Sequence, residues 1–367
     1  MASLSSHPLP ASALQAPALQ RIYENTPKTP PAGAVTSSEG AAPSTSGAQR
    51  LPEEDSRIRA RALGGRYELA GYLDSGGTAD VFAAIDRETG SQVAVKVLNA
   101  KATSDARLRH YFLQGARGAA RVEHANLVRV LAVEEPENAP PYAVMEIVHG
   151  DALSTLIQNH GTLPVDSAVE LALQAASGLE AAHRAGMIHC DVKPENLLVE
   201  AHASERPRLK VIDFDLAAFA DEREAHEHPL LRGTAKYMAP EQVVGDGVDA
   251  RTDVYALGVV LYRTLTGHLP FDLELCPTLL WHQLASPAPP LSWLRDELEP
   301  NLEAIVQRAL RKAPDNRYTS MADLIADLRS FKSGGPLLAR LPLSEPDAYL
   351  PRTDAGRAAA RAIARCV

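Results

Sequence analysis

The pattern of hydrophobic and polar positions divides the chain into three kinds of segment. Residues 1–60 are dominated by Ala, Pro, Ser, Thr and Gly, and such a segment buries too little apolar surface to offset the entropy lost on ordering. Short runs rich in β-branched residues follow, such as 92–98 and 142–148, and are typical of strands. Further along, apolar residues recur at helical spacing, as in 165–182. These patterns predict an α+β fold, in which a disordered N-terminal arm precedes a small β-rich part and a larger, mainly helical part.

Composition narrows the class of protein. A chain of 367 residues is expected to form two or three folding units, and a hydrophobic content of 45% is enough for a core. Only three cysteines occur, Cys190, Cys276 and Cys366, and they are too few and too scattered for a disulfide framework or a zinc cluster. A reducing cytoplasm is therefore the simpler inference.

Membrane and nucleic-acid functions are not expected. The N-terminal residues have no basic start, and prolines interrupt their apolar runs, so they do not predict a secretory signal. No uninterrupted apolar stretch reaches the roughly 18 residues that span a bilayer. A net charge of -9 argues against nucleic acid as a main partner. We therefore expect a free cytoplasmic protein with no membrane span.

Two polar clusters carry the candidate chemistry. The stretch 189–196 contains Asp191, Lys193 and Asn196, and Asp213 follows a short apolar run. Phosphoryl transfer needs mainly a positioned base, metal ligands and a cation beside the phosphates. Read alone, Asp213 or Asn196 is more often a capping or solvated residue than a metal ligand. Their combination favours phosphoryl transfer.

Further blocks repeat a known family pattern. They are a glycine-rich segment, a strand that ends in a lysine, an Ala-Pro-Glu triplet, an apolar helix headed by an aspartate and a late arginine: 73–81, 93–96, 239–241, 253–258 and Arg317. Together with the two polar clusters, they resemble the eukaryotic-type (Hanks-type) bacterial serine/threonine protein kinases from about Arg66 to Phe331. The resemblance implies a bilobal protein-kinase-like fold with a small β-rich N-lobe, a larger helical C-lobe and a C-terminal tail, at 66–148, 149–331 and 332–367.

The resemblance also implies roles for single residues. Asp191 is expected to take the proton of the substrate hydroxyl, and Lys193 to neutralise charge on the transferred phosphate. Asn196 and Asp213 are expected to hold Mg²⁺ through oxygen atoms. The residues expected to bind ATP line its phosphates or its adenine ring: Leu73, Gly76, Gly77, Val81, Ala94, Lys96, Met145, Glu146, Val148 and Leu198. The expected reaction is transfer of the ATP γ-phosphate to Ser or Thr of protein substrates.

The chain departs from the family pattern in the helix after the lysine strand. In the family, a glutamate from this helix pairs with the lysine that corresponds to Lys96, and the alignment puts Gly115 in its place. Gly115 and Gly118 together also cost the helix about 2 kcal/mol relative to alanines. We therefore expect a mobile helix that an activating partner, or the chain's own tail, would order.

Other departures surround the expected active site. Cys190 replaces an arginine that in many relatives binds a phosphorylated activation segment, and residues 213–233 contain no Ser, Thr or Tyr. These two absences agree with each other. Asp215 replaces a glycine that lets the segment switch, and Asp74 replaces the first glycine of the phosphate loop. The sequence offers no physical reason for Asp74.

Three functions remain open at this level. They are an active Ser/Thr protein kinase, a pseudokinase that acts as a nucleotide- or protein-binding scaffold, and a small-molecule phosphotransferase. The resemblance implies that the Ala-Pro-Glu triplet and Arg317 support the binding of protein substrates, which disfavours the third. Retention of every group that touches phosphate, metal or hydroxyl favours the first over the second. The last stretch, 355–367, predicts a basic amphipathic helix or, more simply, a frayed tail.

Overall fold

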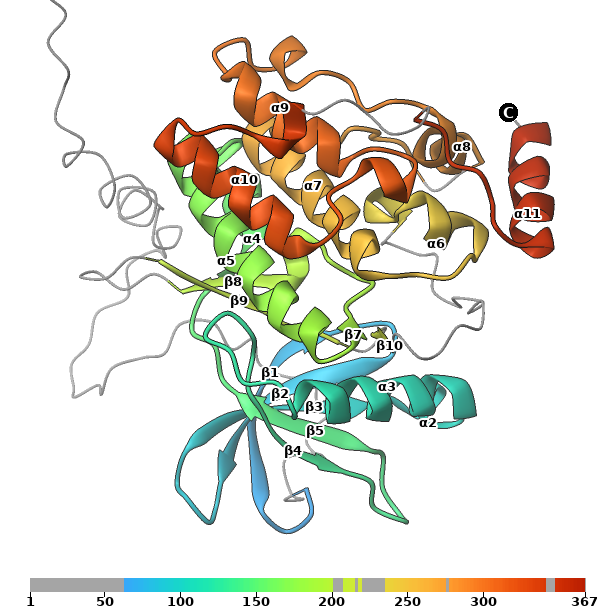
Figure 1. The fold of residues 1–367 in the computed structure, drawn as a ribbon. Coiled ribbons are helices and arrows are strands. Elements are labelled where there is room, and N and C mark those ends of the chain that lie inside the picture. The colour runs from blue at the N-terminus through green and yellow to red at the C-terminus, as the bar shows by residue number, and fades with distance from the viewer. Residues whose placement is uncertain are drawn as a thin grey trace, which may run out of the picture.

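Two lobes make up the described part of the chain (Figure 1). The computed structural model describes residues 63–200, 207–214, 217–219, 235–274, 277–340 and 347–366. The predicted N-terminal arm, 1–60, lies outside these residues, as do Asp215 and the segment 220–234. None of the helices in the described ranges is both long and apolar enough to cross a membrane.

A five-stranded antiparallel sheet in the order β1-β2-β3-β5-β4 forms the small lobe. Its strands are β1 (Tyr67–Ser75), β2 (Ala79–Asp86), β3 (Gln92–Leu98), β4 (Val130–Glu134) and β5 (Tyr142–Glu146). Alternate residues of a strand face opposite sides of the sheet, so Val93 and Val95 enter one core with Phe82 and Val144. The predicted run 92–98 coincides with β3, and the run 142–148 forms β5 and the residues after it.

Helix α3 (Ala106–Ala119) packs on the other face of this sheet, after the short helix α2 (Ala100–Thr103) (Figure 1). Phe112 and Ala116 of α3 share a core with Leu98 and Ala143 of the sheet. Asp105 caps the helix, because its carboxylate accepts hydrogen bonds from the N–H groups of residues 107 and 108 at 2.9 and 3.3 Å. The helix is therefore continuous in spite of its two glycines.

The large lobe is mainly helical. Its helices are α4 (Leu153–His160), α5 (Val165–Arg184), α6 (Pro240–Val244), α7 (Ala250–Thr266), α8 (Pro277–Ala285), α9 (Pro300–Ala309), α10 (Met321–Ser333) and α11 (Asp354–Arg365). Short 3₁₀ turns η2 (Pro194–Asn196), η3 (Ala235–Tyr237), η4 (Leu291–Trp293), η5 (Pro314–Asn316) and η6 (Leu338–Arg340) connect them. The helix predicted over 165–182 is α5, which continues to Arg184.

Short strands complete the large lobe on the side of the small lobe (Figure 1). They are β6 (Asp151–Ala152), β7 (Met187–Ile188), β8 (Leu197–Glu200), β9 (Arg208–Val211) and β10 (Ala218–Phe219). The segment between β7 and β8 carries the first polar cluster, and Asp213 follows β9. Backbone pairing of β8 with β9 brings these two segments together.

The C-terminal stretch is a docked helix, which corrects the expectation of a frayed tail. Ala359, Ala360 and Ile363 of α11 pack against Val244 and Leu284 in one apolar cluster. Figure 1 shows α11 beside α6 and α8, on the large lobe and away from α3. The described part of the tail therefore lies away from the helix that it was expected to order.

Candidate active site

The register of the small-lobe sheet gathers four of the expected nucleotide-binding side chains on one face. Val81 lies opposite Lys96, and Ala94 lies opposite Met145. Ala94 and Lys96 are two residues apart on β3, so their side chains point to the same face. Leu198 belongs to β8 of the large lobe. The expected apolar walls of the adenine site thus come from both lobes.

The glycine-rich segment forms the turn between β1 and β2. The N–H of Gly76 donates to the carbonyl of Ala79 at 2.8 Å, and a Cβ at Gly77 would meet nothing within 4 Å. Leu73, at the end of β1, is 45% exposed. The carboxylate of Asp74 accepts a hydrogen bond from the N–H of Ser75 at 2.8 Å. Asp74 therefore stabilises the turn, which the sequence alone did not explain.

The segment after β5 joins the two lobes and carries the residues expected to bind adenine through their backbone. Met145 and Glu146 end β5, and Val148 follows. The carboxylate of Glu146 accepts hydrogen bonds from the N–H of Arg129 at 2.8 Å and from Lys210 of β9 at 2.7 Å. The Glu146 side chain therefore ties the sheet to the large lobe, a role that the sequence did not predict.

Lys96 pairs with the expected metal ligand Asp213. Lys96 Nζ lies 2.6 Å from Asp213 Oδ1, and Lys96 is only 8% exposed. Asp213 has a positive φ of 68°, a conformation that costs a residue with a side chain about 1–3 kcal/mol. The sequence of α3 contains no Asp or Glu, so the carboxylate that faces Lys96 comes from the large lobe. The two expected sites, for phosphate and for metal, are thus brought together.

The first polar cluster folds into a loop in which three expected residues meet. Lys193 Nζ donates to Asp191 Oδ2 at 2.7 Å, and Asn196 Nδ2 donates to the same oxygen at 3.1 Å. The carbonyl of Asn196 accepts from the N–H of Ile212 at 3.0 Å, which links the loop to the segment of Asp213. Asp191 and Asn196 are both buried. Their geometry is therefore set by the loop itself.

The second oxygen of Asp191 is the most informative atom of the site. Oδ1 is buried, and among the described residues it has no hydrogen-bond partner. A buried carboxylate oxygen without a donor costs about 1–3 kcal/mol. Lys193 and Asn196 occupy Oδ2 and so fix the direction in which Oδ1 can accept a proton or a hydrogen bond.

Asp253 of α7 binds the backbone of this loop. Its carboxylate accepts hydrogen bonds from the N–H of His189 at 2.8 Å and of Cys190 at 2.9 Å, and His183 Nε2 lies 2.7 Å away. Burial alone raises the pKa of Asp253, but the hydrogen bond from His183 and the backbone donors outweigh it and leave that pKa below its usual value. The positive φ of 64° at Cys190 is therefore stabilised by a charged acceptor. Cys190 itself is buried, with 4% of its surface exposed. The contact of His183 with Asp253 was not expected from the sequence.

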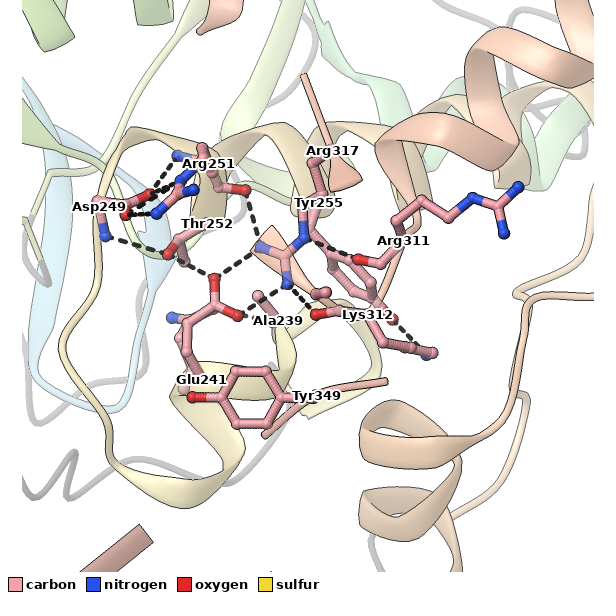
Figure 2. A network of polar contacts seen from close by, with 12 residues as sticks. Ala239, Glu241, Asp249, Arg251, Thr252, Tyr255, Arg311, Lys312, Arg317 and Tyr349 are labelled. Carbon is pink, nitrogen blue, oxygen red and sulfur yellow. Dashed lines mark hydrogen bonds and ion pairs between the residues drawn. The ribbon is translucent and has the colours of Figure 1, made fainter. Parts of the chain in front are cut away.

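A buried ion pair anchors the segment that contains the Ala-Pro-Glu triplet (Figure 2). Arg317 donates to both carboxylate oxygens of Glu241 at 2.7 and 2.8 Å, and Thr252 donates to the first of them at 2.8 Å. The remaining guanidinium donors reach the carbonyls of Arg251, Arg311 and Lys312 at 2.8 to 3.0 Å. Gln242 Nε2 also donates to the carbonyl of Cys190 at 2.8 Å. Through its neighbour Gln242, the segment 235–241 is therefore fixed to the loop of the first polar cluster, and we call 235–241 the platform.

The oxygen donors of the site fit Mg²⁺. In the described ranges no group of three or more His, Cys, Asp or Glu residues could hold a metal ion. Mg²⁺ is commonly bound by only one or two carboxylates, with phosphates and water completing its shell. Since Asn196 donates through Nδ2, its Oδ1 is left as an acceptor, and Asp213 supplies a carboxylate. A two-ligand site of this kind depends on a bound phosphate.

Comparisons with known proteins agree with this geometry. A family model described as the protein kinase domain matches residues 67–327. Serine/threonine-protein kinase PknB of Mycobacterium leprae is 38% identical over 309 residues, which are 80% of this chain and 49% of that protein. Serine/threonine-protein kinase Pkn1 of Myxococcus xanthus is 39% identical over 261 residues, which are 70% of this chain and 37% of that protein.

A solved structure gives the same result for the fold. The kinase domain of Mycobacterium tuberculosis PknI is 26% identical, with a TM-score of 0.56 over 72% of this chain and 95% of that domain. The present chain spans half or less of the length of the two curated relatives. The match with the family covers the small-lobe sheet, the large lobe as far as residue 327 in α10, and every residue of the site described above. The chain therefore belongs to the protein kinase family.

Proposed function

We propose that the chain transfers the γ-phosphoryl group of ATP to Ser or Thr hydroxyl groups of proteins, with Asp191 as the base. The observation that carries the proposal is the Asp191 carboxylate, whose Oδ2 is held by Lys193 and Asn196 while Oδ1 is buried without a partner among the described residues. A hydroxyl donor would satisfy Oδ1. The names of the matched relatives support Ser and Thr as acceptors.

In the proposed step, the substrate oxygen forms a bond to the γ-phosphorus while the bond to the bridging oxygen breaks and ADP leaves. Asp191 Oδ1 accepts the hydroxyl proton. Lys193, 2.7 Å from Asp191, is close enough to neutralise charge on the transferred group.

ATP would bind between the lobes through the residues expected from the sequence. Lys96 and the backbone of Gly76 and Gly77 would contact phosphates, and the backbone of Glu146 and Val148 would contact adenine. Apolar contacts with the ring would come from both lobes: Leu73, Val81, Ala94, Met145 and Leu198. Asn196 and Asp213 would hold Mg²⁺, which when bound neutralises phosphate charge and orients the γ-phosphate.

A pseudokinase that binds nucleotide or protein without transfer is the second candidate. It is favoured by the absence of any Asp or Glu from α3 and by the ion pair in which Lys96 binds the carboxylate of Asp213. Mg²⁺ would have to compete with that ion pair for the carboxylate. An activating partner that orders the helix around Gly115 stays a prediction, and α3 is already helical in the structure.

The test uses the purified full chain with radiolabelled ATP, Mg²⁺ and a generic basic protein substrate. We expect Asp191→Asn and Asp213→Asn each to lower transfer by about 10²–10⁴-fold, because each loses a group that acts on the transferred phosphate or proton. The matched control is Asp166→Asn, an exposed aspartate of α5, which should retain wild-type transfer. A wild-type rate no higher than that of the two variants, together with retained ATP binding, would favour the pseudokinase.

A further inference from the structure

The C-terminal segment 347–366 docks on the large lobe beyond the part of the chain that matches the protein kinase domain, which ends at residue 327. Tyr349 and Ile363 pack against Val244 at the end of α6 and Leu284 of α8. Figure 1 shows α11 lying beside these two helices. The segment thus bridges α6, which begins with the Ala-Pro-Glu triplet, and α8.

One anchor of this segment is Asp246, which follows α6 and is 3% exposed. Its carboxylate accepts hydrogen bonds from the hydroxyls of Tyr349 and Thr353 at 2.6 and 2.5 Å, and from the N–H groups of Arg352 and Thr353 at 2.8 and 3.2 Å. The N–H of Asp246 donates to the carbonyl of Glu241 at 2.9 Å. A single residue, Asp246, therefore connects the tail to Glu241 of the Glu241–Arg317 ion pair.

The second anchor lies on the arginine side of that ion pair. Asp347 accepts hydrogen bonds from the N–H groups of Lys312 and Ala313 at 2.8 and 3.3 Å. The carbonyl of Lys312 in turn accepts from Arg317 at 3.0 Å. The two anchors thus hold the ion pair from both sides, and Figure 2 shows Tyr349 next to Glu241.

Helix α8, which the tail contacts, also binds the backbone of the platform. Gln283, 1% exposed, donates through Nε2 to the carbonyls of Ala235 and Lys236 at 3.2 and 3.0 Å. Tyr255 of α7 donates to Gln283 Oε1 at 2.6 Å. The neighbour of Gln283, Leu284, is in the apolar cluster with α11. A shift of α8 would therefore move the backbone of 235–236.

We propose that residues 347–366 are a positioning element that holds the platform in the geometry needed for binding the protein substrate, with Asp246 as the positioning residue. The inference rests on the proposed function, which assigns the protein substrate to the platform. It assigns no part in ATP binding to the tail, because the contacts that place the tail among the described residues are with α6, α8 and the loop 311–313 of the large lobe.

Gly356 allows a sharp test in the full chain. A Cβ at Gly356 would lie 2.5 Å from Asp246 Oδ1, so in Gly356→Ala either the Asp246 carboxylate or the tail must shift, and the anchor is weakened although alanine favours the helix more than glycine does. The matched control is Ala362→Gly on the exposed face of α11, which weakens the helix without touching Asp246. The two variants therefore have opposite expected effects on helix formation, and only Gly356→Ala disturbs the anchor.

We expect Gly356→Ala to raise the KM for the protein substrate about tenfold and to leave the KM for ATP within a factor of about two, whereas Ala362→Gly keeps both constants. Tyr349→Phe, which removes one donor to Asp246, should also raise the KM for the protein substrate. A KM for protein unchanged in both anchor variants, or an equal rise of both KM values, overturns the inference.

A second measurement does not depend on activity. Hydrogen exchange of the backbone N–H groups of 235–244 should be faster in Gly356→Ala than in wild type, and unchanged in Ala362→Gly. If wild type transfers no phosphate, the proposed function fails, and this exchange measurement still decides the positioning. Equal exchange in wild type and Gly356→Ala shows that the tail does not hold the platform.

Discussion

At the scale of single residues, Lys312 is a buried lysine beside Tyr255 and Gln283, two residues that support the platform. It is 1% exposed and donates to the Tyr255 hydroxyl at 3.1 Å and to the carbonyl of Gln283 at 2.9 Å. Its Nζ also lies 4.7 Å from the ring centroid of Phe271. Burial, and secondly the charge of Arg317, lower the pKa of Lys312 to about 7. This lysine therefore loses its proton near neutral pH.

The shift predicts how stability depends on pH. Between about pH 7 and 10.5 the unfolded chain keeps the proton of Lys312 and the folded chain releases it, so the free energy of unfolding should rise with pH by up to about 1.4 kcal/mol per unit. We expect the difference in unfolding free energy between wild type and Lys312→Met to shift by about 2 kcal/mol in favour of wild type from about pH 7 to pH 9. Urea denaturation at several pH values measures it.

Lys101→Met is the matched control, because Lys101 is exposed. Its difference from wild type should stay constant over the same pH range. A difference that also stays constant for Lys312→Met would show that Lys312 keeps its proton in the folded protein.

At the scale of elements, α3 packs on the sheet as an ordinary helix but lacks the acidic residue that the family has in the helix after the lysine strand. Its buried residues include Phe112, Leu113 and Gly115, and its sequence contains no Asp or Glu. Lys96 consequently pairs with Asp213 across the lobes. Under the proposed function, this pair holds the metal ligand in an ion pair whenever Mg²⁺ is absent.

Gly115→Glu tests whether the missing carboxylate limits catalysis. A glutamate at this position would pair with Lys96 and release Asp213 toward Mg²⁺, so we expect the rate of phosphate transfer to rise about tenfold, the size typical of a lost supporting partner. Gly115→Ala serves as the control, since it raises helix propensity by about 1 kcal/mol without adding charge. Equal rates in both variants would attribute any gain to the helix and not to the ion pair.

At the scale of the whole molecule, most of the buried apolar surface lies in the large lobe, and its core reaches Ala119 at the end of α3. One contiguous core surrounds α5 and α7 in the large lobe, with residues such as Leu179, Leu257 and Leu302 fully buried. The small lobe has two smaller clusters, one on each face of its sheet. Because stability follows buried apolar surface, the small lobe should open at lower free energy than the large lobe.

Native-state hydrogen exchange measures this difference directly. We expect the N–H groups of β1–β3 to exchange at least about tenfold faster than those of α5 and α7, a difference of about 1.4 kcal/mol in opening free energy. A nonhydrolysable ATP analogue with Mg²⁺ should slow exchange in β1–β3, because ligand binding stabilises only the folded lobe. Exchange of α9, far from the expected nucleotide site in Figure 1, should be unchanged. Uniform exchange through both lobes would mean that they unfold as one unit.

Several elements followed from the sequence because their causes are local. The β-branched run 92–98 became β3, and the helical pattern of 165–182 became α5. Asp191, Lys193 and Asn196 are separated by only a few residues, so one loop brings them into contact. The C-terminal helix was the least well predicted element, because its stability depends on a surface elsewhere in the chain.

The sequence by itself thus determined where the main strands and helices form and which polar residues a single loop brings together. These follow from side-chain periodicity and from short spacings that hold in any folded form of the chain. Only the tertiary structure decided which charges meet over long distances. Lys96 pairs with Asp213, His183 lies against Asp253, and Asp246 accepts a hydrogen bond from the hydroxyl of Thr353, 107 residues further along. Such pairs form only when packing of the apolar faces brings distant segments together, since buried polar groups then bind whichever donors lie within reach.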